Sequence, residues 1–226
     1  MKKRLLVIPA KGYSKRIKEK NIKLFYGKPI ISYALLNAKK SKLFSQIHVS
    51  TESKKVKRIV EKIGFKVDFL RPNKLAKKDT PVINVLRFVY ERYLKLNINF
   101  DEIWTLSSCT PLLKSTDLIK AAKVSKKNKV LLSVTKFGAP IEWALNKKKK
   151  GNLKPLFPGK LFQNSQKFSD KFYDAGSFAI FPNKFLKKKR INLKNNFIGF
   201  VLPRERAIDI DNLEDWKLAE YMYKVK

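Results

Sequence analysis

Two kinds of segment follow one another along this chain. Short apolar runs, of which residues 5–8 are the first, are typical of strands buried in a parallel sheet. Longer segments with apolar residues three or four positions apart predict amphipathic helices. The short runs predict strands at 5–8, 46–50, 66–70, 102–106, 130–134, 173–181 and 197–202, and the periodic segments predict helices at 29–40, 53–63, 82–96, 115–124 and 212–224.

This order of strands and helices predicts an α/β fold with one open, mostly parallel, doubly wound sheet. Ligands of such sheets bind beyond the carboxyl ends of the strands. We therefore expect the loops at 9–21, 71–80 and 107–111 to converge on one cleft. Residues 136–172 have no clean period, and we expect them to leave the sheet as a hairpin and an extended arm within a single domain spanning 1–226.

The composition is that of a folded globule with a large positive charge. The chain has 226 residues, 44% of them hydrophobic, and 52 Lys and Arg against 18 Asp and Glu, a net charge of +34. Such a charge can indicate a nucleic-acid partner. Here the lysines are spread over the whole length, and the run at 147–150 lacks the interleaved aromatic residues that stack on bases. We expect weak, salt-sensitive binding to polyanions but no specific nucleic-acid partner.

The single cysteine and single histidine limit the possible chemistry. Cys109 alone can form neither an internal disulfide nor a cysteine-based zinc site, so we expect a cytosolic protein. We interpret Cys109 as a small buried residue rather than a nucleophile, and His48, inside a predicted strand, as structural. No segment has the length needed to span a bilayer, so no membrane partner is expected.

The loop after the first predicted strand combines small residues with positive charge. Pro9 ends the strand because it has no N–H for the sheet ladder. Backbone N–H groups and ammonium ions of such a loop can surround a triphosphate. A solvated basic loop would have the same composition in so lysine-rich a chain. The small and cationic residues of the loop are Ala10, Lys11, Gly12, Ser14, Lys15, Arg16, Lys18 and Lys20.

This segment resembles the N-terminal signature of the sugar-acid cytidylyltransferases, the enzymes that make CMP-sialic acid and its relatives. The matching positions are Pro9, Ala10, Gly12, Ser14, Lys15, Arg16, Lys20, Asn21, Gly27, Lys28 and Pro29. Lys11 stands where the family has Arg, and Tyr13 where it commonly has a small residue. The resemblance implies the Rossmann-like fold of nucleotide-diphospho-sugar transferases, catalytic roles for Lys11 and Lys20, and nucleotide binding by Pro9, Ala10, Lys11, Gly12, Ser14, Lys20 and Asn21.

A pair of acidic residues precedes the last predicted helix. In an extended strand residues two apart face the same side, so Asp209 and Asp211 would point together. Two adjacent carboxylates repel unless a cation lies between them, and their hard oxygen ligands suit Mg²⁺. A solvated pair that caps the next helix is the alternative. The resembling family holds Mg²⁺ with the same Ile-Asp-Ile-Asp, which implies a magnesium site at Asp209 and Asp211 and a catalytic role for Asp211.

Shorter matches extend the resemblance along the chain. An Arg-Pro pair and a later Asp-Thr pair imply nucleotide contacts by Arg71, Asp79 and Thr80. The implied sugar-binding residues are Ser107, Ser165, Gln166, Asp174 and Ser177. The segments at 140–145, 157–166 and 173–176 look more like the pseudaminic acid branch of the family than the sialic acid branch. In the family the segment that corresponds to 136–172 packs against a second subunit and closes that subunit's site, which implies a homodimer.

The implied reaction joins CMP from CTP to a nine-carbon 2-keto sugar acid, pseudaminic acid being favoured, and releases pyrophosphate. Its product would serve surface glycan or flagellin glycosylation. Sialic, legionaminic and eight-carbon ketodeoxy acids are alternative acceptors within the same chemistry. A basic nucleic-acid-binding protein, or a family member without activity, is the alternative from a different class.

Overall fold

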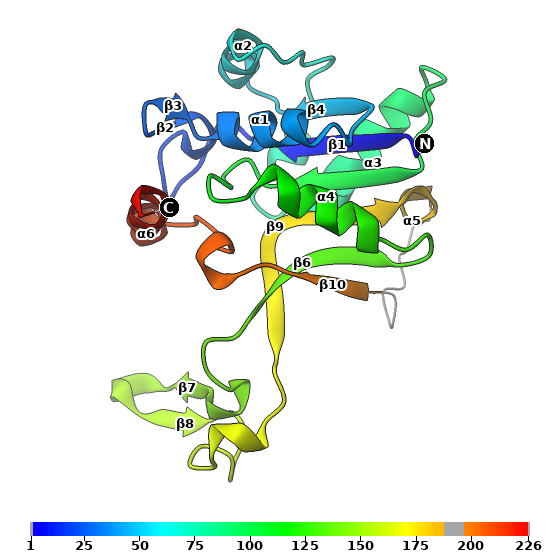
Figure 1. Ribbon diagram of the computed structural model, residues 1–226. Helices are drawn as coiled ribbons and strands as arrows, with labels where there is room; N and C mark the ends of the chain where they lie inside the picture. Colours follow the sequence, from blue (N-terminus) through cyan, green and yellow to red (C-terminus); the bar gives the residue numbers. More distant parts are fainter. Residues whose placement is uncertain (1, 188–196, 226) are drawn as a thin grey trace.

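The computed structural model describes residues 2–187 and 197–225, and its centre is a six-stranded sheet (Figure 1). The strand order is β10-β6-β9-β5-β1-β4. β9 is antiparallel to its neighbours β5 and β6, and the other neighbouring pairs are parallel, which confirms the predicted mostly parallel α/β sheet. The strands are β1 (Arg4–Pro9), β4 (Gln46–Ser50), β5 (Glu102–Leu106), β6 (Val130–Lys136), β9 (Phe172–Pro182) and β10 (Phe197–Val201).

The helices lie close to their predicted ranges, and α2 (Lys54–Lys62) and α6 (Leu213–Lys224) each begin at a capping side chain. Ser53 accepts a hydrogen bond from the N–H of Val56 at the start of α2, and Asn212 accepts from two N–H groups at the start of α6. The α-helices are α1 (Ile31–Ser41), α2 (Lys54–Lys62), α3 (Val82–Leu94), α4 (Ser115–Val124), α5 (Asn183–Lys187), which was not predicted, and α6 (Leu213–Lys224). Short 3-10 turns lie at Lys20–Ile22, Asn73–Ala76, Ile141–Trp143, Lys149–Gly151, Ser165–Lys167 and Arg204–Arg206.

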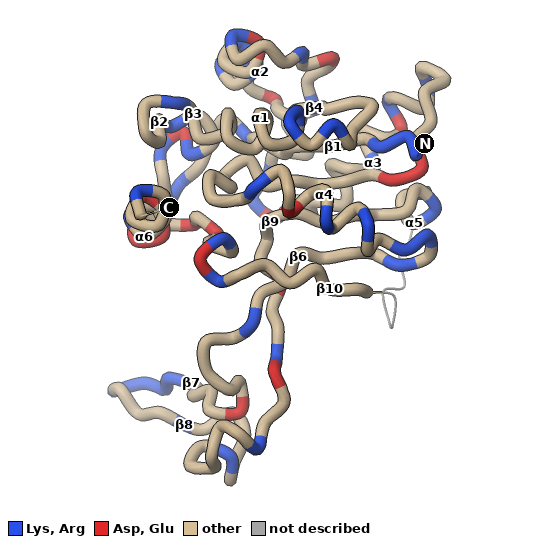
Figure 2. Tube along the Cα trace, in the orientation of Figure 1, with Lys and Arg blue, Asp and Glu red and all other residues tan. Residues whose placement is uncertain are grey.

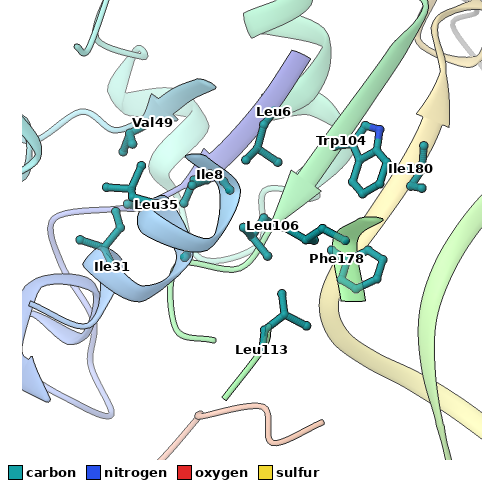
Figure 3. Close-up of a cluster of buried hydrophobic side chains, with 14 of the residues drawn as sticks. Leu6, Ile8, Ile31, Leu35, Val49, Trp104, Leu106, Leu113, Phe178 and Ile180 are labelled. Atoms are coloured by element: carbon teal, nitrogen blue, oxygen red, sulfur yellow. The ribbon is translucent and has the colours of Figure 1, made fainter. Parts of the chain in front are cut away.

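β1 shows why its apolar run is uninterrupted. Leu6 and Ile8 enter a core cluster with α1, α2 and α4 on one face of the sheet (Figure 3). Leu5 and Val7 enter a second cluster with α3 and α5 on the other face. Alternate side chains of a strand point to opposite faces, so both faces of β1 are covered. Burial of each such side chain contributes about 1.5–3 kcal/mol, which makes β1 the anchor of the loop that follows it.

The strand predicted at 66–70 is wrong. The segment has no strand geometry in the structure and lies beside the edge strand β4, attached through side chains. Asp68 accepts a 2.8 Å hydrogen bond from Gln46 of β4, and Phe69 stacks on His48 at 4.3 Å between ring centroids. The backbone meets the sheet at Arg71, whose N–H donates to the carbonyl of Thr51. Apolar alternation here reflects packing on the sheet edge rather than ladder pairing.

A third apolar cluster attaches the C-terminal helix to the N-terminal part of the chain. β2 (Leu24–Phe25) and β3 (Lys28–Pro29) form a small antiparallel hairpin. Phe25 is fully buried and meets Trp216 of α6 edge-to-face, with ring centroids 5.6 Å apart. This contact brings the residues that precede α6 to the carboxyl end of β1.

Residues 137–171 form an arm that extends away from the sheet between β6 and β9 (Figure 1). The arm contains the hairpin of β7 (Leu145–Lys147) and β8 (Leu153–Pro155). The Lys171 ammonium lies 3.4 Å from the Glu142 carboxylate, and the Trp143 indole donates to the Gln163 carbonyl, so the arm has contacts of its own. Its exposed large apolar residues are Leu145, Leu153, Leu156, Phe157 and Phe162.

Positive charge is spread over the molecule rather than gathered on one element. Figure 2 shows Lys and Arg on helices, loops and the arm alike. Among the described residues, no helix has the length and apolar character that crossing a bilayer requires.

Candidate active site

A cavity of about 780 Å³ opens beyond the carboxyl ends of β1, β4 and β5. Residues of all three predicted loops line it, which confirms that these loops converge. Of the predicted site residues, Pro9, Lys11, Ser14, Lys20, Asn21, Arg71, Thr80 and Ser107 line the cavity. The lining also includes Tyr13, Lys15, Arg16, Glu52, Lys77, Lys78, Ser108 and Cys109. Such a concentration of cations in one concave site favours a highly charged anionic ligand.

The loop after β1 continues along β4 beyond the end of the regular ladder. The N–H of Ala10 donates to the carbonyl of Ser50 at 2.9 Å, and the N–H of Gly12 donates to the Glu52 carboxylate at 2.7 Å. A Cβ atom at Gly12 would lie 2.5 Å from Cβ of Ser53, so this close approach requires glycine. Ala10 is fully buried in the core, and its predicted nucleotide contact is therefore limited to its backbone.

Asn21 fixes the same loop from its other end. Its side-chain amide donates to the Lys11 carbonyl at 2.7 Å, and its side-chain oxygen accepts from the Ser108 hydroxyl at 2.7 Å. The residue is buried, so these bonds are shielded from water. Asn21 therefore joins the β1 loop to the turn after β5.

Arg71 is buried beside the cavity and paired with a carboxylate. Its guanidinium donates from Nε at 3.2 Å and from Nη2 at 2.9 Å to Oε2 of Glu52. Only 5% of the Arg71 surface is exposed. Two donors on one carboxylate oxygen orient the planar guanidinium more strictly than a single contact would.

Lys20 and Arg16 connect the cavity to the acidic residues before α6. The Lys20 ammonium donates to the Ile210 carbonyl at 2.6 Å and lies 3.4 Å from Oδ1 of Asp211. Arg16 donates to the same Asp211 oxygen at 2.8 Å. Asp211 itself does not line the cavity, but the two cations that hold it do.

Asp209 and Asp211 lie close enough to influence each other, although the extended strand predicted for them is absent and the segment is coil. Enclosure by the surrounding chain, and then repulsion from Asp211, raise the pKa of Asp209, whereas Lys20 and Arg16 oppose the rise. Asp209 still keeps an exposed surface. A Cβ atom at Gly176 would lie 3.2 Å from Oδ2 of Asp209, which places this carboxylate against β9.

The predicted sugar-binding residues fall into two places. The Ser107 N–H donates to the Ser177 carbonyl at 2.8 Å, and the Ser177 side chain is buried. Asp174 is exposed on β9 and accepts from the Gly176 N–H at 2.9 Å. Ser165 and Gln166 lie in the arm, which Figure 1 shows extending away from the sheet, and neither of them lines the cavity. The structure thus brings Ser107 and Ser177 together, places Asp174 three positions before Ser177 on β9, and leaves Ser165 and Gln166 apart in the arm.

Asp79, Cys109 and His48 differ in how they relate to the cavity. Asp79 is exposed and does not line the cavity, although its neighbour Thr80 does. Cys109 lines the cavity with a buried thiol, and burial raises the pKa of that thiol to about 11. The thiol is therefore protonated at neutral pH, which supports its interpretation as a packing residue. His48 is fully buried on β4, and burial lowers its pKa.

Sequence reasoning missed the roles of Glu52, Ser108 and, in part, Arg16. Glu52 and Ser108 act on the loop through hydrogen bonds that depend on how three strands end, which no local pattern reveals. Arg16 was recognised as one of several loop cations, but its bond to Asp211 spans 195 positions of sequence. The scarcity of acids in this chain was the one available signal for Glu52.

A second hollow of about 570 Å³ lies at the opposite end of the sheet. Its buried acid, Glu102, is paired with Lys2 at 2.5 Å and Arg4 at 2.8 Å, and it also accepts a hydrogen bond from Trp104. Because both oxygens of the Glu102 carboxylate already have protein partners, we interpret Glu102 as a residue that stabilises the start of β5. The loop-lined cavity is therefore the candidate active site.

Comparisons with known proteins agree on one family. A family model described as cytidylyltransferase matches residues 5–223. The chain is 33% identical over 229 residues to the pseudaminic acid cytidylyltransferase of Campylobacter jejuni subsp. jejuni serotype O:2, covering 99% of this chain and 97% of the relative. It is 29% identical over 233 residues to the CMP-N,N'-diacetyllegionaminic acid synthase of Legionella pneumophila, covering 98% and 96%. Its fold is similar to that of CMP:2-keto-3-deoxy-manno-octonic acid synthetase complexed with CTP, with a TM-score of 0.73, 15% identity and 99% of each chain covered.

Proposed function

Since the chain belongs to the cytidylyltransferase family, we propose that it transfers CMP from CTP to a nine-carbon 2-keto sugar acid, and that this acid is pseudaminic acid. The full-length similarity to the Campylobacter jejuni enzyme supports the choice of acid. Sialic, legionaminic and eight-carbon ketodeoxy acids are the competing acceptors, because relatives that act on such acids share the same chemistry.

One observation carries this proposal: a cavity lined by cations, with two carboxylates held at its edge. Lys11, Lys15 and Lys20 supply positive charge to the lining. Asp211 is attached to that lining through Lys20 and Arg16. Nucleotidyl transfer needs this combination, since the triphosphate must be neutralised and the acceptor oxygen must approach the α-phosphorus.

The chain's own residues would then act by position and charge. The anomeric hydroxyl of the sugar acid attacks the α-phosphorus of CTP in line and loses its proton to solvent as the new O–P bond forms. Pyrophosphate leaves with the electrons of the broken P–O bond. Lys11 and Lys20 hold the phosphate oxygens and stabilise the charge that develops on them. Arg71 and Thr80, on the far side of the cavity, hold the rest of the nucleotide, while Ser107, Asp174 and Ser177 border the place of the sugar.

The donor set fits a magnesium ion. Asp209 and Asp211 offer carboxylate oxygens, the ligands that Mg²⁺ prefers, and leave further positions for phosphate and water. Burial, and then repulsion from Asp211, raise the pKa of Asp209, and a shared cation would relieve the repulsion. When bound there, Mg²⁺ would neutralise phosphate charge and lower the pKa of the attacking hydroxyl. Asp211 would have to exchange its contacts with Arg16 and Lys20 for this ion.

A homodimer would bring the arm into the site. Ser165 and Gln166 lie in the arm, which extends away from the sheet (Figure 1), and neither lines the cavity of its own subunit. Phe162 is 97% exposed, and its apolar neighbours in the arm are also exposed. We infer that a second copy of the chain covers these side chains, and that each arm carries Ser165 and Gln166 to the sugar site of the partner. A cytosolic location and the absence of a specific nucleic-acid partner remain predictions.

The test is pyrophosphate release from each of the four nucleoside triphosphates, with Mg²⁺ and a panel of sugar acids. We expect release with CTP and pseudaminic acid. Release with CTP and another acid would keep the mechanism and change the substrate. No release with any pair, in a folded protein, would contradict the proposed activity and favour a family member without activity.

A further inference from the structure

Glu52 is an acid in a cavity where the other charged lining residues are cations. A carboxylate next to a triphosphate is unfavourable by itself, since like charges repel. Its 15% exposed side chain is instead turned toward protein groups. The contacts of both of its oxygens explain why the chain places an acid there.

The first oxygen holds the β1 loop. Oε1 of Glu52 accepts the 2.7 Å hydrogen bond from the N–H of Gly12. This bond follows the Ala10–Ser50 bond, so the Glu52 side chain continues the β1–β4 pairing where the backbone ladder has ended. The N–H of Gly12 therefore has a protein acceptor, Glu52, in this structure.

The second oxygen holds Arg71. Oε2 of Glu52 accepts from Nε and Nη2 of Arg71, and the neighbouring Thr51 carbonyl accepts from the Arg71 backbone N–H at 2.9 Å. Arg71 therefore has both its backbone and its guanidinium fixed by the end of β4. One carboxylate thus sets the relative position of the β1 loop and Arg71, which reach the cavity from separate segments of the chain.

We propose that Glu52 is a positioning residue for nucleotide binding. It holds the β1 loop and Arg71 in the arrangement in which both can contact the same bound triphosphate. The inference rests on the proposed function in that it takes the cavity to be the CTP site. Glu52 acts through Gly12 and Arg71 and touches no reacting atom. Its loss should therefore weaken nucleotide binding while leaving the affinity for the sugar acid unchanged.

The test compares Glu52→Gln with Glu61→Gln. The glutamine at position 52 keeps an oxygen for Gly12, but it loses the charge and turns an N–H donor toward the Arg71 donors. We expect the KM for CTP to rise about tenfold, with a smaller change in kcat and an unchanged KM for the sugar acid. Glu61 lies on α2 and pairs with the exposed Lys57 at 3.7 Å, so Glu61→Gln should match the wild type.

A second measurement does not depend on the ligand. Hydrogen–deuterium exchange of the peptide spanning residues 9–16 should be faster in Glu52→Gln, because the Gly12 N–H loses a charged acceptor. An unchanged KM for CTP in a folded Glu52→Gln protein would overturn the proposal. An equal loss of affinity for CTP and for the sugar acid, together with a lower Tm, would also overturn the proposal. That result is expected of a residue that only stabilises the fold. Failure of the wild type to use CTP would instead contradict the proposed function, and the exchange rates would still decide whether Glu52 holds the loop.

Discussion

The Lys20 ammonium donates a 2.6 Å hydrogen bond to the carbonyl oxygen of Ile210 and lies 3.4 Å from the carboxylate of Asp211. In the sequence, Lys20 lies 190 positions before Ile210 and 191 positions before Asp211. The contact joins the cation-rich loop after β1 to the acidic segment before α6. The acidic segment therefore lies next to the cavity that the loop lines. Lys20 therefore contributes to the positive charge of the cavity lining and, together with Arg16, holds Asp211 in place.

Replacement of Lys20 by methionine should reduce kcat/KM by about 100-fold, because the variant loses a positive charge of the cavity lining and a contact that places Asp211. The measurement is steady-state pyrophosphate release with CTP and the best acceptor. Lys18→Met provides the control, since Lys18 is an exposed cation of the same loop. A Lys20→Met protein with wild-type kinetics would contradict the role assigned to Lys20.

Replacement of Asp211 by alanine should abolish turnover, with kcat falling by about 1,000-fold or more, while the protein remains folded. The fold should persist because the backbone N–H of residue 211 can still donate to Asp215, the acid that completes the cap of α6. Turnover should be measured over a range of Mg²⁺ concentrations, and Tm should be measured alongside.

Glu214→Gln is the matched control for Asp211→Ala, because Glu214 is an exposed acid three positions further along at the start of α6. Its substitution should leave both turnover and the Mg²⁺ dependence unchanged. Unchanged activity of Asp211→Ala would contradict the magnesium assignment.

Acid should destabilise the fold through two groups at the edge of the sheet, the buried His48 and the partly buried Asp68. The His48 ring, whose Nδ1 lies 3.9 Å from Oδ2 of Asp68, and the hydrogen bond from Tyr93 lower the pKa of Asp68 from 3.8 to about 2. A lowered carboxyl pKa contributes stability that is present above about pH 4 and is lost as the pH falls toward 2. Burial also lowers the pKa of His48 below its ordinary 6.5, so the unfolded chain binds a proton first and stability falls below that pH as well.

Asp68→Asn should therefore flatten the lower part of this acid profile. We expect it to cost about 1–2 kcal/mol at pH 7, after allowance for the solvent that reaches this side chain, and to cost little near pH 2. Urea unfolding at a series of pH values measures both effects. The control is Asp170→Asn, which removes an exposed partner of Lys136 and should change stability little at any pH. Parallel profiles for wild type and Asp68→Asn would contradict the assignment.

The arm provides a prediction about assembly. Phe162→Ser should weaken the proposed homodimer, because Phe162 is the most exposed large apolar side chain among the described residues. Sedimentation equilibrium should show more monomer, and activity should decrease at low protein concentration and recover at high concentration. Leu36→Ser is the control, since Leu36 is exposed on α1, away from the arm. A monomeric wild type with full activity would contradict the dimer.

Much of the fold could be predicted from the sequence because the signals are local. The run in β1 is apolar at every position since both faces of the strand are covered, and Ser53 and Asn212 mark the starts of α2 and α6. The wrong strand at 66–70 has the same apolar alternation as a true strand, but its side chains pack on β4 without a ladder. The direction of β9, antiparallel to both neighbours, likewise has no local signal.

The sequence by itself determined the α/β class, the family, and the chemical character of the loops, because apolar period, capping and motif spacing are properties of neighbouring residues. Only the tertiary structure decided which of these residues meet. Asp211 is held by Lys20 and Arg16, Gly12 and Arg71 share Glu52, and Ser165 lies apart in the arm. Such contacts join residues from the ends of different strands, so their distances depend on sheet order and on the packing of α6, which the linear pattern does not contain.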